Sequence, residues 1–181
     1  MKFKNISITG RLCYLFLCIE QYLIFCYPDR DWTIVSQKCW QWTNTYWNKA
    51  CDEYCKIIPY YLLEFDTYEE TNEKEFDGTL SQEEYHILRK LYDNIASGDK
   101  KEEINEMLLL PVLFNNACEG VCFAEADTST TAILVKAESI LVRHAIPFPD
   151  IEKITFLTVK QKGGWGDFIE SEFLSMLDTI R

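Results

Sequence analysis

The sequence predicts an all-α protein that folds as one domain over residues 1–181, with about seven helices. Apolar residues recur at spacings of three and four through most of the chain, which is the period of a helix with one buried face. The chain has only five prolines and seven glycines, and no hairpin turn is flanked by β-rich runs. Its 181 residues, 48% of them hydrophobic, are enough for one sizeable core, and no linker divides them.

Three helices are expected in the first third of the chain. Apolar faces run over residues 12–26, 31–42 and 46–57, and Pro28 separates the first two. Pro59 either ends the third helix or opens a short helical turn. The candidate N-cap of the second helix is Asp31, and that of the third is Asn44 or Thr45.

The clearest helix start in the rest of the chain is Ser81, followed three residues later by Glu84. This spacing is a capping box, in which the two residues satisfy each other's backbone N–H groups, and Gly98 closes the helix. Residues 154–159 form either a short strand or an extended segment. Further helices are expected over 102–109, from Pro111 to about Phe123, from a cap at Thr128 or Ser129 to His144, and over 167–180.

The chain carries a formal net charge of −11, from 18 basic and 29 acidic residues. A surface this acidic repels nucleic-acid phosphates and anionic membranes, so neither is expected as a partner, whereas a basic protein is attracted. Most of the excess lies between Glu64 and Glu84, where nine acids accompany one base, Lys74. Such a run is typical of a solvated loop, but it also suits a docking surface for a cationic protein.

An apolar stretch near the N-terminus, Leu12 to Tyr27, superficially resembles a signal peptide. Glu20 and Gln21 interrupt it, no small-residue cleavage site follows, and it is shorter than the roughly 20 residues that span a bilayer. We therefore expect a buried helix in a cytoplasmic protein. The eight cysteines would then stay reduced and pack as small apolar side chains.

Two pairs of cysteines share a C-x3-C spacing, Cys51 with Cys55 and Cys118 with Cys122. Four thiolates can in principle build a zinc site. Structural zinc sites usually use C-x2-C knuckles with a glycine turn, whereas these pairs lie in apolar helical patterns, so packing in the core is the favoured interpretation. No metal and no cofactor is expected, and a zinc-stabilised domain remains an alternative that metal analysis tests.

The tryptophans and histidines also favour structural interpretations. Single-strand binders interleave their aromatic residues with lysine and arginine, whereas the Trp-rich segment has only Lys38 and Lys49, so its rings are expected to fill the core. Glu83 and His86 have the E-x-x-H spacing of di-iron bundles, but no second pair accompanies them, and each histidine is expected to lie on the surface or cap a helix. The tryptophans of this segment are Trp32, Trp40, Trp42 and Trp47. The other histidine of the chain is His144.

The stretch GGWGDF, residues 163–168, precedes an expected helix, where backbone N–H groups can hold a phosphate. Asp167 and Glu170 fill that helix start with their own carboxylates, and neither lysine nor serine follows. A tight loop around Trp165, with Asp167 as the helix cap, is the favoured interpretation. No catalytic motif remains, and the chain is not expected to be an enzyme.

Four pieces of the sequence resemble one of the all-helical immunity-protein families of bacterial polymorphic toxin systems. They are GRLCYLFLCIEQYL (10–23), Trp47 with Pro59 downstream, PFPDIEK (147–153) and GGWGDF (163–168). The resemblance covers residues 5–65 and 115–175, and implies a small cytoplasmic protein that binds one cognate toxin domain and blocks it. Toxin contacts in such proteins vary with the toxin, so the resemblance assigns no contact residue.

The charge agrees with this role, because nuclease toxins are typically basic and an acidic inhibitor can occupy the surface that holds phosphates. We expect the acidic segment to face the toxin, with Tyr68 and Phe76 as aromatic anchors amid the charge. The residues expected to bind the partner are Glu64, Asp66, Tyr68, Glu69, Glu70, Glu73, Glu75, Phe76 and Asp77.

Two other functions stay open. The first is a generic acidic adaptor that binds proteins without any toxin, which gene neighbourhood separates from an inhibitor. The second is an enzyme of unfamiliar type, which would need a deep polar pocket in which carboxylates from several helices converge.

Overall fold

The longest apolar run of the sequence forms the central helix α1, Ile8–Cys26, in the computed structural model. Every residue of α1 from Ile8 to Glu20 is buried, as the sequence predicts for a core helix. By length and composition α1 resembles a membrane span, but 89% of its most apolar window is buried by the rest of the protein. The structure describes residues 2–45, 47–74, 80–96, 99–170 and 174–177.

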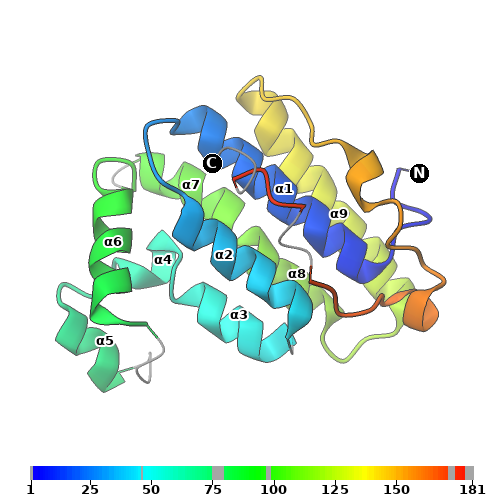
Figure 1. The fold of residues 1–181 in the computed structure, drawn as a ribbon, viewed down its shortest axis with the longest axis horizontal. Helices are drawn as coiled ribbons and strands as arrows, with labels where there is room; N and C mark the ends of the chain where they lie inside the picture. The colour runs from blue at the N-terminus through cyan, green and yellow to red at the C-terminus, as the bar shows by residue number, and fades with distance from the viewer. Residues whose placement is uncertain (1, 46, 75–79, 97–98, 171–173, 178–181) are drawn as a thin grey trace.

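Helices pack around α1 from several sides (Figure 1). The long helix α9, Phe123–Arg143, runs alongside it, and α8, Leu110–Cys118, packs against both. Helices α2, Thr33–Gln41, and α3, Trp47–Cys55, pack against each other, and α2 also contacts α1. The all-α, single-domain prediction is confirmed.

The remaining helices lie toward one end of the molecule, where α5 and α6 form a corner (Figure 1). No strand forms in the described residues, and segment 154–159 contributes one isolated antiparallel bridge, between Ile6 and Thr158. The bounds are α4 Pro59–Leu62, α5 Tyr68–Lys74, α6 Gln82–Tyr92 and α7 Asp99–Leu108, with 3₁₀ turns at Trp42–Asn44, Ile151–Ile154 and Gln161–Gly164.

Three of the four tryptophans in the Trp-rich segment fill the core, as predicted. Trp32, Trp40 and Trp42 are each no more than 1% exposed. The rings of Trp40 and Trp42 lie 5.6 and 6.1 Å from the ring of Phe16 on α1, which fixes α2 against the central helix. The fourth, Trp47, is only half-buried and has a different environment.

The N-cap of α9 lies six or seven residues before the predicted caps. It is Cys122, which makes no side-chain capping hydrogen bond, so the start carries no polar signature. The two predicted caps lie inside the helix, where the Thr128 hydroxyl donates to the carbonyl of Ala124, four residues earlier. The predicted start at Thr128 or Ser129 is therefore wrong.

The predicted helix over 167–180 is also wrong for the residues that the structure describes there. Residues 166–170 are irregular, and their backbone bonds to another part of the chain. The Ile169 N–H donates to the Thr43 carbonyl at 2.9 Å, and the Thr43 hydroxyl donates to the Ile169 carbonyl at 3.1 Å. Hydrogen bonds across the fold thus replace those of a local helix.

Candidate functional site

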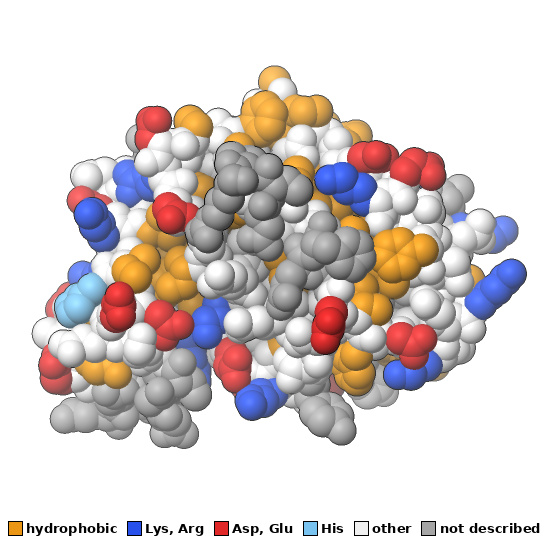
Figure 2. Space-filling model, viewed as in Figure 1, with side chains coloured by type: hydrophobic (Ala, Val, Ile, Leu, Met, Phe, Trp, Pro, Cys, Tyr) orange, Lys and Arg blue, Asp and Glu red, His pale blue; other side chains and the backbone are white. Residues whose placement is uncertain are grey.

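Exposed carboxylates gather at the corner that α5 and α6 form. Glu64, Asp66, Glu69 and Glu83 are all exposed, and none of them makes an ion pair with a described residue. Figure 2 shows acidic and apolar side chains side by side over this corner. These four carboxylates are named the acidic corner below, and they are available to a cationic partner.

Two of the predicted partner-binding residues also hold α5 in place. The Glu70 carboxylate accepts the Asp66 N–H at 3.0 Å, and so caps the start of the helix. Tyr68 is half-buried, and its hydroxyl donates to the Leu80 carbonyl at 3.1 Å while its ring lies 5.9 Å from that of Tyr85. Their contact with a partner stays a prediction, but both already have a structural role.

Carboxylates of this region lie close enough to Tyr85 of α6 to affect its ionisation. The pKa of Tyr85 is raised, mainly because the ring is buried; the nearby Arg89 guanidinium lowers this pKa, and the Asp66, Glu70 and Glu69 carboxylates raise it further.

Part of the predicted partner-binding segment lies outside the described residues. Glu75, Phe76 and Asp77 belong to this part, as does the side chain of Glu73 on α5. Their role in partner binding stays a prediction.

The two cysteine pairs have different environments. Cys51 and Cys55 lie one turn apart on α3, and the Cys51 thiol hydrogen-bonds to Cys55, which lowers the pKa of Cys55 and raises that of Cys51. Cys118 is buried on α8, whereas Cys122 is exposed at the start of α9. Within the described part of the chain, no three His, Cys, Asp or Glu side chains come close enough together to hold a metal ion.

The histidines lie where the sequence predicts. His86 is exposed on α6, and His144 is the C-cap residue of α9, with its ring 5.4 Å from that of Tyr22. A histidine at a helix C-terminus is close to the carbonyl groups that complete the helix, and it needs no catalytic role to explain its place.

The glycine-rich stretch forms a tight loop, as predicted, but Asp167 caps no helix. Because residues 166–170 are irregular, the loop presents no helix N-terminus to a phosphate. The Asp167 carboxylate instead pairs with the Lys162 ammonium at 3.1 Å. The Thr9 hydroxyl on α1 donates to the carbonyl of Trp165 at 3.0 Å and holds the loop against the central helix.

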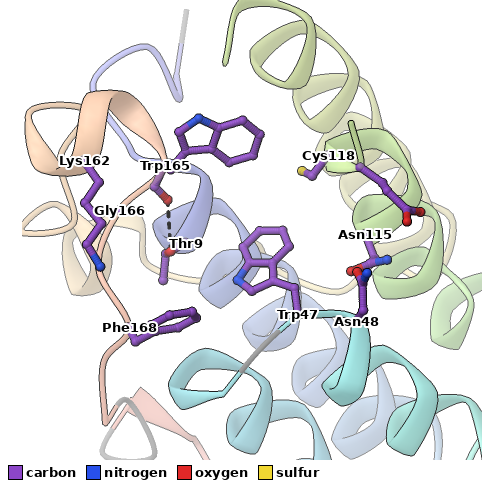
Figure 3. A pocket seen from close by; sticks show the side chains of 10 residues that line it. Thr9, Trp47, Asn48, Asn115, Cys118, Lys162, Trp165, Gly166 and Phe168 are labelled. Carbon is purple, nitrogen blue, oxygen red and sulfur yellow. Dashed lines mark hydrogen bonds between the residues drawn. The ribbon is translucent and has the colours of Figure 1, made fainter. Parts of the chain in front are cut away.

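This loop forms one wall of a pocket of about 320 Å³. The rings of Trp165 and Phe168 line it from the loop, and the ring of Trp47 lines it from α3. Figure 3 shows Trp47 between the loop and α8, with Cys118 of α8 across from Trp165. The pocket is therefore bounded by aromatic rings from two segments that are far apart in the sequence.

Polar groups complete the pocket opposite the aromatic loop. Asn48 of α3 and Asn115 of α8 point toward the same space beside Trp47 (Figure 3). Asn115 is 6% exposed, and its side-chain amide hydrogen-bonds to no described residue. Glu119, the C-cap residue of α8, also lines the pocket, and it forms no ion pair within the described residues.

No local pattern in the sequence indicates this pocket, because Trp47 and the GGWGDF stretch lie far apart along the chain. Both were among the pieces that carry the immunity-protein resemblance, and the fold brings them together. Aromatic residues in both pieces were the available signal, but nothing in their spacing indicated that a loop near residue 165 would reach α3.

Comparison with known proteins finds no matching family model, no similar curated protein and no similar solved structure. No family membership or activity is transferred to the chain on this basis. The acidic corner and the aromatic pocket are the two features that bear on its function.

Proposed function

We propose that the chain is an immunity protein, which binds a cognate bacterial toxin domain in the cytoplasm and neutralises it by stoichiometric inhibition. The partner is a basic protein, and a nuclease fits best because its active surface must hold phosphates. The observation that carries the proposal is the acidic corner, where four exposed carboxylates make no ion pair with any residue that the structure describes.

The proposal assigns no reaction to the protein itself. The buried Glu20 carboxylate at its centre is used within the fold, where it accepts hydrogen bonds from Trp40 and Ser175. What the surface offers is charge, and complementary charge raises association rates from about 10⁵–10⁶ toward 10⁸–10⁹ M⁻¹s⁻¹ at low salt. An inhibitor of a lethal enzyme benefits directly from rapid capture.

The test is co-expression of the chain with the C-terminal domain of the toxin encoded beside it. Rescue of growth together with co-purification of a stable complex is the expected result. Co-purification without rescue would favour the adaptor function, and rescue without any complex would contradict stoichiometric inhibition.

A charge-reversal variant locates the surface. Because Glu70 caps α5, the variant should combine Glu64→Lys, Asp66→Lys and Glu69→Lys and leave Glu70 in place. We expect slower association and weaker protection, with an effect that shrinks as salt rises. The matched control reverses Glu125 and Glu152, which are exposed elsewhere on the molecule. Equal protection by both variants would show that the acidic corner is not part of the interface with the toxin.

A further inference from the structure

The aromatic pocket has the chemistry of a site for a planar cation. Aromatic ring faces carry negative charge density and attract cations, tryptophan most strongly. One cation already lies on such a face at the rim, because the Lys162 ammonium is 5.3 Å from the centre of the Phe168 ring. Lys162 is paired with Asp167, so it adds little net positive charge that would repel a second cation.

Two acceptors in the pocket have no partner among the residues that the structure describes. The Asn115 amide is buried, faces the pocket and makes no hydrogen bond to any residue that the structure describes. A ligand that donates hydrogen bonds to the amide oxygen would supply the partner that Asn115 lacks among the described residues. The Glu119 carboxylate is the second acceptor, and within the described chain it has no cation to neutralise it.

The C-terminal end of α8 also favours a positively charged ligand. The helix ends at Cys118, and its last carbonyl groups carry the negative end of the helix dipole. Glu119 adds an anion at this end, where an anion is unfavourable for the helix and a cation is favourable. A cation bound here therefore offsets the unfavourable interaction between the Glu119 carboxylate and the helix dipole.

We propose that this pocket receives an arginine side chain of the protein partner, with the guanidinium stacked on the tryptophan rings and donating hydrogen bonds to Asn115 and Glu119. A volume of about 320 Å³ admits one long side chain, and the net charge of −11 favours a cationic occupant. Arginine fits better than lysine, because its planar and weakly hydrated guanidinium stacks on aromatic rings and donates in several directions. The identity of the donor protein rests on the proposed function, but the chemistry of the pocket does not.

The first test needs no partner protein. N-acetylarginine methylamide is titrated against the full chain while the indole N–H signals of Trp47 and Trp165 are followed by NMR. We expect saturable shifts in the millimolar range, with binding about tenfold tighter than for N-acetyllysine methylamide. N-acetylnorleucine methylamide and adenosine serve as apolar and nucleobase controls. Equal binding of the lysine or norleucine probe, tighter binding of adenosine, or no saturable shift with any probe would overturn the proposal.

Variants of the acceptors and of the rim cation sharpen the test. Asn115→Leu should weaken binding of the arginine probe about tenfold, because it removes the buried acceptor. Glu119→Gln should weaken it about threefold, as loss of an exposed ion pair does, and should do so even if Asn115→Leu fails to fold. Glu125→Gln, at an exposed position outside the pocket, is the matched control. Unchanged affinity in Glu119→Gln would overturn the role of this carboxylate and with it the proposal.

Removing the rim cation should have the opposite effect. Lys162→Met leaves the Asp167 carboxylate unpaired beside the pocket, and we expect the arginine probe to bind about threefold more tightly. Lys160→Met, an exposed position outside the pocket, is the control and should change nothing. Binding of the arginine probe without binding of any toxin would contradict the proposed function but support the arginine site. Binding of a toxin without binding of the probe would support the proposed function but contradict the arginine site.

Discussion

The Glu20 carboxylate accepts the backbone N–H of Met176 at 2.8 Å, across 156 residues of sequence. Glu20 is 1% exposed, and its other oxygen accepts hydrogen bonds from Trp40 Nε1 and Ser175 Oγ, both at 2.7 Å, and from the Ser36 hydroxyl. One buried carboxylate therefore joins α1, α2 and the segment near the C-terminus.

We expect Glu20→Gln to lower the free energy of unfolding by about 2 kcal/mol. The amide has the same size, but its NH₂ group faces hydrogen-bond donors and cannot accept from them, so at least one donor loses its partner. Urea denaturation followed by tryptophan fluorescence measures the change, with the exposed Glu64→Gln as the control. An unfolding midpoint equal to that of the wild type would show that the hydrogen bonds of Glu20 do not stabilise the fold.

Gly166 is required for the close approach of the glycine-rich loop to α1. Its φ is +86°, and an added Cβ would lie 2.7 Å from the Ser7 hydroxyl and 2.8 Å from that of Thr9. We expect Gly166→Ala to cost about 3 kcal/mol, from backbone strain and overpacking together. Gly163→Ala is the matched control, because its φ of +63° carries the strain but no atom lies within 4 Å of the new Cβ. Thermal unfolding should separate the two variants, and equal midpoints would contradict the packing argument.

The parts of the fold that the sequence predicted well are those with local causes. The apolar periodicity of α1 and the capping box of α6 depend on residues within a few positions of each other, and both formed as expected. The predicted start of α9 was wrong because the Thr128 hydroxyl bonds to a carbonyl inside the helix, an arrangement that a single sequence does not distinguish from a cap.

Long-range hydrogen bonds explain the other differences between the sequence-based predictions and the structure. The segment 167–180 has a helical pattern, but contacts of Ile169 with Thr43 and of Met176 with Glu20 determine the conformation of its described residues. The aromatic pocket has the same origin, since Trp47 and Trp165 meet only after the loop has docked on α1. Composition predicted the acidic character of the surface, but no local pattern predicted this pocket.

The capping box of α6 should make stability depend on pH. Burial alone would raise the pKa of Glu84, but hydrogen bonds from Ser81 and the Lys38 ammonium at 3.6 Å outweigh it and lower that pKa. Because the folded pKa lies below the roughly 4.3 of an unfolded chain, the stabilisation is complete above that value and is lost as pH falls through the folded pKa.

We therefore expect Glu84→Gln to destabilise the protein by about 0.5–1 kcal/mol near pH 7 and by less as the solution becomes acidic. Glu83→Gln is the control, because Glu83 is exposed beside it and has no place in the capping box. Urea denaturation at a series of pH values measures the difference. A cost of Glu84→Gln that stays constant down to the acid-unfolding range would contradict the linkage.

The thiols should differ in reactivity according to their environment rather than their pairing in the sequence. Only the thiolate reacts, so a raised pKa slows alkylation at a given pH. Burial raises the pKa of Cys118 to about 12 and that of Cys26 to about 11. The hydrogen bond from Cys51 lowers the pKa of Cys55, and Cys122 is exposed.

Brief treatment of the native protein with iodoacetamide near pH 8 should label Cys55 and Cys122 first. Cys118 should be labelled slowly although it lines the pocket, and at a rate that still rises with pH above 10, because its thiolate is scarce below its pKa of about 12. Peptide mass spectrometry measures each site, and the same protein in concentrated urea, where all thiols should react alike, is the control. Rapid native labelling of Cys118 would mean that this side chain is far less buried than the packing of α8 indicates.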